Sequence, residues 1–97
     1  MQIRWAPKAA AALESIVDYI SRDNPIEAER VGQEIYGSVS SILGNFPRGG
    51  RPGRVEGTRE LPLPPLPFIV VYRVIEHADA AEIVNVIHGA QRWPPEG

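Results

Sequence analysis

Apolar residues in the first half of the chain recur with the spacing of one helix face. The first such stretch follows Pro7, which suits the first turn of a helix because its missing N–H would have no helical partner there. The apolar positions fit the i, i+3, i+4, i+7 pattern, and they are Leu13, Ile16, Val17 and Ile20. The pattern predicts a helix over residues 7–22.

A second helical stripe begins shortly afterwards. Asn24 can act as the N-cap, Pro25 suits the first turn, and Glu27 takes the capping-box position. The apolar positions that follow are Ala28, Val31, Ile35, Val39, Ile42 and Phe46. We therefore expect a helix over residues 25–44. The connection between the two helices is so short that they must form an antiparallel hairpin.

The second half of the chain changes to strand patterns. Residues 47–57 are rich in Pro and Gly and predict a loop. Residues 58–63, 68–76 and 81–88 predict strands, as do residues 2–5. The order β-α-α-β-β-β predicts an α+β fold with an N-terminal helix hairpin packed on a small, mostly antiparallel sheet. The last three strands would form a meander that the first strand joins, within one domain over residues 1–97.

Composition limits the class of protein. The 97 residues are 43% apolar, which suffices for one modest core, and they include no cysteine, so disulfides and thiolate sites are excluded. No apolar run approaches the roughly 20 residues of a membrane span, and the N-terminus lacks the apolar segment of a signal peptide. We therefore expect a cytoplasmic protein with no membrane partner.

The charge is unevenly distributed. The net charge is −2, whereas proteins that grip a nucleic-acid backbone usually carry a net basic surface. Residues 14–34 are mostly acidic, but the segment 46–60 holds Arg48, Arg51, Arg54 and Arg59 against Glu56 and Glu60. This segment is either a local basic edge or a solvated loop rich in arginine.

Few residues have the arrangement that catalysis or metal binding requires. His77 and His88 lie at opposite ends of one predicted strand, and at about 3.3 Å per residue they cannot share a metal. The glycines at 49–53 lack the Lys-Ser/Thr pair of a phosphate-binding loop. We expect no metal site, no cofactor and no serine triad.

The candidates for binding a target are polar or aromatic residues of the later strands and the tail, namely Arg59, Arg73, His88, Arg92 and Trp93. Such groups at a strand's exit usually mark a working surface. Arg73 lies in an otherwise apolar strand, so it must reach solvent, pair with a carboxylate or bind an anion. Glu60 or Glu82 could supply the carboxylate; alternatively, Arg59 could join Arg73 in an anion site.

His88 and Trp93 each have two interpretations. His88 could act as a general acid or base near neutral pH, or it could bond to the backbone at the end of its strand. Trp93 could stack on a base or on a partner's side chain, or it could seal the edge of the sheet.

Short motifs are spread in order along nearly all of the chain. They are Trp5-x-Pro7, Asp18-Tyr19-Ile20, Asp23-Asn24-Pro25, Ala28-Glu29-Arg30-Val31, Phe46-Pro47-x-x-Gly50-Arg51-Pro52, Gly57-Thr58-Arg59-Glu60-Leu61, Val70-Val71-Tyr72-Arg73-Val74 and His88-Gly-Ala-x-Arg92-Trp93-Pro94. Together they resemble the RelE/ParE toxin superfamily. The fold of that family, a small sheet faced by an N-terminal helix hairpin, agrees with the predicted order of elements.

The resemblance implies the toxin of a type II toxin–antitoxin module of the plasmid stabilisation type. A cognate antitoxin would neutralise it in a hetero-oligomeric complex, by adding a strand to an open sheet edge and docking an amphipathic helix. The residues expected to meet the antitoxin are Leu13, Val17, Ile20, Ile35 and Val39. RelE-like members of the superfamily cut mRNA on the ribosome, and ParE-like members inhibit DNA gyrase.

The residues favour the ParE-like branch. RelE-like nucleases typically carry an arginine three positions before the strand tyrosine that is Tyr72 in this chain, and Ile69 occupies that position. An isoleucine cannot stabilise a phosphate in a transition state. The alternative is a ribosome-dependent endoribonuclease with His88 as acid or base and Arg73 on the scissile phosphate. A third possibility is a non-toxic member that only binds its antitoxin.

Overall fold

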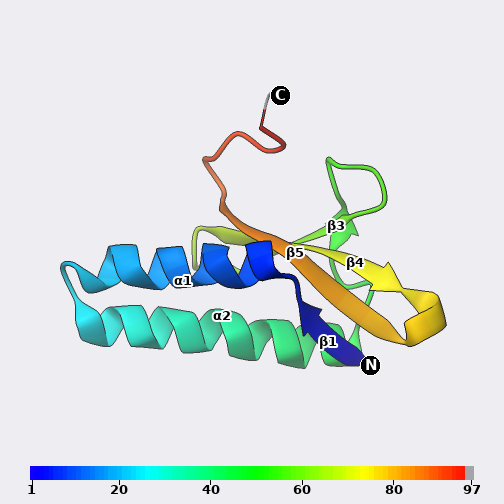
Figure 1. Ribbon diagram of the computed structural model, residues 1–97, viewed down its shortest axis with the longest axis horizontal. Coiled ribbons are helices and arrows are strands. Elements are labelled where there is room, and N and C mark those ends of the chain that lie inside the picture. The colour runs from blue at the N-terminus through cyan, green and yellow to red at the C-terminus, as the bar shows by residue number, and fades with distance from the viewer. Residues whose placement is uncertain (96–97) are drawn as a thin grey trace.

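The computed structural model describes residues 1–95, and it has the element order that the sequence predicts, with one additional strand, β2, and one short 3-10 helix, η1 (Figure 1). The limits of the predicted helices and strands are correct to within one residue, the usual uncertainty of such limits. The elements are β1 (Gln2–Trp5), α1 (Pro7–Ser21), α2 (Pro25–Asn45), β2 (Arg51–Pro52), β3 (Arg59–Pro62), β4 (Phe68–Ile75), the short 3-10 helix η1 (Glu76–Ala78) and β5 (Ala80–His88).

The five strands form one sheet in the order β1-β5-β4-β3-β2. Strands β3, β4 and β5 are the expected antiparallel meander, and β1 joins it by pairing parallel to β5. The expectation that residues 47–57 form only a loop is wrong for β2, where Arg51 lies opposite Glu60 and Pro52 opposite Arg59. This strand is two residues long and lies at the edge of the sheet, where a proline is tolerated.

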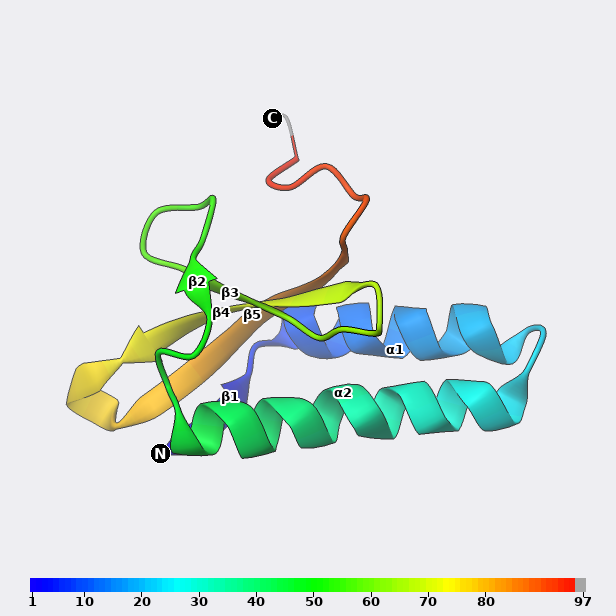
Figure 2. The same ribbon diagram turned by 180° about the vertical axis from the view of Figure 1, so that it is seen from behind.

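The two helices form the predicted antiparallel hairpin and cover one face of the sheet (Figures 1 and 2). The side chain of Asn24 accepts a hydrogen bond from the Glu27 N–H at 3.1 Å, which confirms the predicted N-cap of α2. Side chains from both helices and from the sheet region make the core between these layers, and its buried members are Ala9, Val31, Ile35, Val39, Leu43, Leu61, Leu63, Val70, Tyr72, Ala81 and Ile83.

The opposite face of the sheet is flanked by two irregular segments. The loop that joins β2 to β3 and the tail that follows β5 both project away from the helix hairpin (Figures 1 and 2). Candidate functional residues therefore fall on two sides of the molecule. Within residues 1–95, no helix combines the length and the apolar character needed to cross a membrane.

Candidate functional site

An apolar groove of about 580 Å³ lies between the helix hairpin and the start of β4. One polar residue lies at each of its two sides, Glu27 on α2 and His88 at the end of β5. The other lining residues are nearly all apolar: Ser15, Ile16, Tyr19, Ile20, Val31, Leu66, Pro67 and Phe68. Tyr19 is 71% exposed, although the Arg22 guanidinium lies over its ring, 5.9 Å from the centroid, so this groove presents a large aromatic surface to solvent.

A second, more polar hollow of about 410 Å³ continues from this groove along α1. The two hollows share Ser15, Ile16, Phe68 and His88. The second one adds the polar side chains of Lys8, Asn85 and Gln91, and the small side chains of Ala11 and Ala12. Together they form a continuous trough beside α1 that is apolar at one end and polar at the other.

His88 is fixed where the two hollows meet. Its Nδ1 accepts a hydrogen bond from the Ala90 N–H at 3.0 Å, and its own N–H donates to the Gln91 side chain at 3.3 Å. The Phe68 ring stands edge-on to the imidazole, with ring centroids 5.8 Å apart. Because Nδ1 is an acceptor, the proton of the neutral imidazole is on Nε2. His88 thus bonds to the backbone at its strand end, one of the two interpretations that the sequence allowed.

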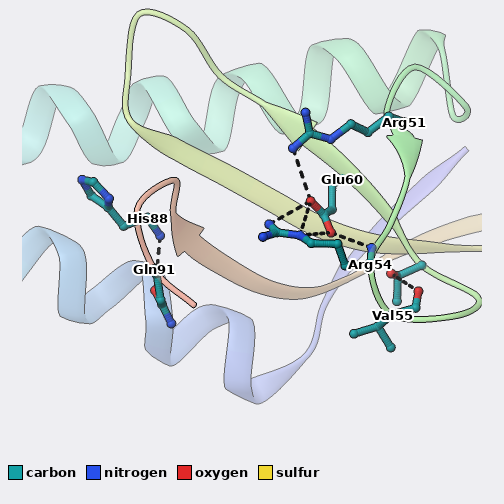
Figure 3. A network of polar contacts seen from close by, with 7 residues as sticks. Arg51, Arg54, Val55, Glu60, His88 and Gln91 are labelled. Carbon is teal, nitrogen blue, oxygen red and sulfur yellow. Dashed lines mark hydrogen bonds and ion pairs between the residues drawn. The ribbon is translucent and has the colours of Figure 1, made fainter. Parts of the chain in front are cut away.

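On the other side of the molecule, the buried carboxylate of Glu60 holds two arginines (Figure 3). Glu60 is 1% exposed. It accepts hydrogen bonds from the Arg54 backbone N–H at 2.8 Å, from the Arg54 guanidinium at 3.0–3.3 Å and from the Arg51 guanidinium at 3.4 Å. Burial raises the pKa of the Glu60 carboxyl, but the hydrogen bonds and positive charges of Arg54 and Arg51 outweigh it and leave the pKa below its ordinary value.

The other arginines near the sheet also have partners. Arg73 donates to Glu82 at 2.7 Å, which is one of the ion pairs that the sequence suggested. Arg48 pairs with Glu76. Arg59 instead donates to the backbone carbonyls of Arg48 and Gly50, and its Nε is buried with no partner among residues 1–95.

The suggested anion site of Arg59 and Arg73 is wrong. Arg59 lies opposite Tyr72 in the β3–β4 register, and Tyr72 belongs to the core beneath the helices. Since neighbouring residues of a strand point to opposite faces, Arg73 faces away from the helices and from Arg59.

His88 and Arg73 do not share a site either. His88 lines the hollows beside α1, whereas Arg73 is paired with Glu82 on the opposite face, six residues back along β5. Six residues of strand span about 20 Å. The alternative in which His88 and Arg73 act on one scissile phosphate is therefore wrong. The two residues lie at different positions along the strands and on opposite faces of the sheet.

Arg92 and Trp93 lie in the tail after β5. Arg92 is exposed, and its side chain is not free of interactions. Trp93 is half-buried, and the Lys8 ammonium lies over its ring, 5.7 Å from the centroid. Its indole Nε1 is buried and has no partner among residues 1–95. The Lys8 contact therefore holds the tail near the first turn of α1.

The residues expected to meet an antitoxin divide into two groups. Ile35 and Val39 are 0% exposed in the core, so the expectation that they form a contact surface is wrong: helical periodicity identifies the inward face of α2. Leu13, Val17 and Ile20 are half-buried, and Ile20 lines the apolar groove. Ile16, Tyr19 and Phe68 also line the groove and were not expected from the sequence. Tyr19 lies outside the apolar stripe of α1, which could have indicated an outward-facing aromatic.

Within residues 1–95, no group of three or more metal-ligating side chains occurs. The described side chains therefore offer a trough with an apolar and a polar end and a histidine where the two meet, and a set of arginines held by carboxylates and carbonyls. Both arrangements suit the binding of macromolecules, through apolar burial on one side and hydrogen-bond donors on the other.

The chain was compared with known families and proteins. Residues 3–93 match the model of a family described as "ParE toxin of type II toxin-antitoxin system, parDE". The Sinorhizobium fredii protein named "Putative toxin Y4kP" is 41% identical over 96% of this chain and 93% of its own length. Toxin RelE2 of Caulobacter vibrioides is 31% identical over 93% of this chain and 97% of its own length.

A solved structure has the same architecture. The structure titled "Chromosomal ParDE TA system from P. aeruginosa" superposes with a TM-score of 0.80 and 31% sequence identity. The match covers 91% of this chain and 95% of the other.

Proposed function

Because this chain belongs to the ParE toxin family of type II toxin–antitoxin systems, we propose that it arrests growth by binding a macromolecular target, DNA gyrase, within a module of the plasmid stabilisation type. A cognate antitoxin neutralises it in a hetero-oligomeric complex. The toxin acts by occupying a surface of its target and forms no covalent intermediate.

The positions of Arg73 and His88 favour a protein that binds its target over an enzyme that cleaves RNA. Stabilising a scissile phosphate requires positive charge or donors aimed at the reacting group. Arg73, the residue that the nuclease alternative would place on the phosphate, is paired with Glu82 at 2.7 Å. His88, the acid or base that cleavage would need, lies on the other side of the sheet from Arg73. The described residues thus favour a binding protein.

Two assays run side by side test the proposed target. Purified toxin is added to DNA gyrase in a supercoiling assay, and mRNA from expressing cells is analysed by primer extension. We expect inhibition of supercoiling and no translation-dependent cuts. Specific cuts that disappear in His88→Ala or Arg73→Ala would establish the ribosome-dependent endoribonuclease instead. Normal growth, intact supercoiling and uncut mRNA together would identify a non-toxic member that only binds its antitoxin.

The apolar groove is the proposed docking site of the antitoxin. Its walls match the apolar face of an amphipathic helix, which is a common way for a segment to bind a groove. The ParDE neighbour, whose title describes a toxin–antitoxin system, supports an antitoxin as the partner. The exposed edge of β1 lies at the end of the sheet order and offers pairing to an added strand.

Two exposed apolar side chains provide a matched test of the groove. Tyr19 lines it and is 71% exposed, whereas Ile26 is 84% exposed and lies outside its lining. We expect Tyr19→Ala to weaken antitoxin binding about tenfold or more, since a desolvated aromatic anchor contributes about 1–2 kcal/mol or more. Ile26→Ala should leave the dissociation constant unchanged. Equal effects of the two variants in calorimetric titration would place the antitoxin elsewhere.

A further inference from the structure

The segment of residues 51–58, which we call the arginine loop, is held by more polar contacts than a simple connection needs. The buried Glu60 carboxylate pairs with Arg51 and Arg54. The Gly53 N–H donates to the Thr58 carbonyl at 2.8 Å, and the Thr58 hydroxyl donates to the Val55 carbonyl at 2.6 Å. The loop therefore has a defined shape, although it projects from the sheet (Figures 1 and 2).

Two glycines allow this shape. A Cβ on Gly53 would approach the Thr58 hydroxyl to 2.2 Å, and Gly57 adopts a φ of 81°, in the left-handed region. A buried ion pair is weak grounds for stability, because desolvating its charges offsets much of their attraction. The role of Glu60 is better explained as positioning, because its bonds fix the orientation of the Arg51 and Arg54 guanidinium groups.

Both guanidinium groups keep donors that their bonds to Glu60 do not use. The side chains of Arg51 and Arg54 are 56% and 44% exposed. A guanidinium has five N–H donors. The Arg51 group uses Nη2 toward Glu60, and the Arg54 group uses Nε and Nη2. The remaining donors of two neighbouring arginines are pre-oriented, which lowers the entropic cost of binding an acceptor.

We propose that the arginine loop is the surface on which this toxin docks an acidic segment of its target protein, with Glu60 as the positioning residue. The inference rests on the proposed function, since it assumes a protein target. The guanidinium fork matches carboxylates in bidentate geometry. Glu60 supplies one carboxylate from inside the chain, and the target supplies the carboxylates that meet the outward donors.

The charge of the molecule favours a protein segment over a nucleic acid. The whole chain has a net charge of −2, so a long polyanion that tracks the surface would meet repulsion outside the loop. Glu60 also neutralises part of the charge that a phosphate would meet at Arg51 and Arg54. A short acidic segment needs only the local donors, and charge complementarity of this kind sets specificity and association rate.

The arginine loop and the apolar groove are separate. The groove lies beside α1 and α2, whereas the loop projects from the sheet away from these helices (Figures 1 and 2). In the close view, Arg51 and Arg54 meet at Glu60, well apart from His88, which lines the groove (Figure 3). A change in the loop should therefore leave antitoxin binding intact.

The test uses Arg51→Gln/Arg54→Gln, with Arg48→Gln as the control, because Arg48 is an exposed arginine outside the loop that is also paired with a glutamate. We expect the loop variant to lose gyrase inhibition and growth arrest by about tenfold or more, with antitoxin affinity and circular dichroism unchanged. The control should behave as the natural protein. Retained growth arrest in the loop variant, or a parallel loss of antitoxin binding, would overturn the proposal. Glu60→Gln, which keeps the shape and removes the charge, should give an intermediate loss.

A second arm separates this inference from the choice of target. Purified toxin is titrated with poly-L-glutamate and, in parallel, with single-stranded DNA. We expect salt-sensitive binding of poly-L-glutamate that the loop variant loses, and DNA binding that is the same in both proteins. If the natural protein does not inhibit gyrase, the proposed target is wrong. The poly-L-glutamate titration then tests the binding role of the arginine loop independently. Loop-dependent binding of DNA in place of poly-L-glutamate would identify a nucleic-acid surface and overturn the inference.

Discussion

The backbone N–H of Gly50 donates to the hydroxyl of Tyr72 at 2.9 Å, across 22 positions of sequence. Tyr72 is 0% exposed at the middle of β4. A Cβ on Gly50 would lie 2.8 Å from the Tyr72 ring and from the Glu60 carbonyl oxygen. The bond therefore ties the chain entering β2 directly to the core, immediately before the arginine loop.

Removing this hydroxyl should destabilise the fold. In Tyr72→Phe the buried Gly50 N–H loses its acceptor, which costs about 1–3 kcal/mol of unfolding free energy. Chemical denaturation measures the change. Tyr19→Phe, at a ring that is 71% exposed, is the control and should change stability by less than about 0.5 kcal/mol. A neutral Tyr72→Phe would mean that the Gly50 N–H finds another acceptor.

Two glycines of α2 should respond in opposite directions to alanine. A Cβ on Gly32 would lie 2.9 Å from the Val17 Cγ2 of α1, whereas a Cβ on Gly37 meets nothing within 4 Å. Gly32→Ala should cost about 1–3 kcal/mol through overpacking, and Gly37→Ala should add up to about 1 kcal/mol through helix propensity. Thermal unfolding of the two variants tests this. Stabilisation of both would show that the helices can move apart at no cost.

Stability should fall in acid through Glu60. Its pKa is lower in the folded protein than in the unfolded chain, so its contribution is complete above the unfolded value of about 4.3 and is lost as the pH falls through the folded value. Glu60→Gln should be less stable at neutral pH and should lose less stability on acidification. Denaturation from pH 7 to pH 3 tests this, with the exposed Glu56→Gln as the control. Parallel curves for Glu60→Gln and the natural protein would contradict the assignment.

The tail should loosen when the charge over Trp93 is removed. In Lys8→Met the cation–π contact is lost, at a cost of about 0.5–1 kcal/mol. The Ala90 and Gln91 N–H groups, which donate to the His88 Nδ1 and carbonyl oxygen, should then exchange faster in hydrogen-exchange measurements. Protection in β5 should not change. Unaltered exchange at both tail amides would show that the turn after His88 holds without the Lys8 contact.

The helices and strands could be predicted because their signals are local. Pro7 and the Asn24-Pro25 pair fix where the helices begin, and both starts are observed. β2 could not be predicted, since Arg51-Pro52 has no strand propensity and pairs only because β3 offers an edge. Its existence depends on a contact across the loop, which no short window of sequence contains.

The candidate sites were harder to predict because they depend on strand register. The pairing of Arg73 with Glu82 was one of two possible pairings, and the β4–β5 register places these residues opposite each other. The same register separates Arg73 from His88. Helical spacing placed Ile35 and Val39 on the apolar face of α2 but did not predict that they are buried. Periodicity identifies an apolar face but does not show whether the protein's own core or a partner covers it.

The parallel pairing of β1 with β5 has a consequence for the moment at which this protein becomes active during synthesis. The first four strand residues, Gln2–Trp5, find their partners only at residues 80–83, and the helix hairpin packs on strands that leave the ribosome after it. The sheet can close only once residues 80–83 have emerged from the ribosome, because pairing across such a separation waits for both strands. A nascent chain that stops before β5 should therefore lack a complete sheet, and any recognition that reads the finished trough must wait until β5 has emerged.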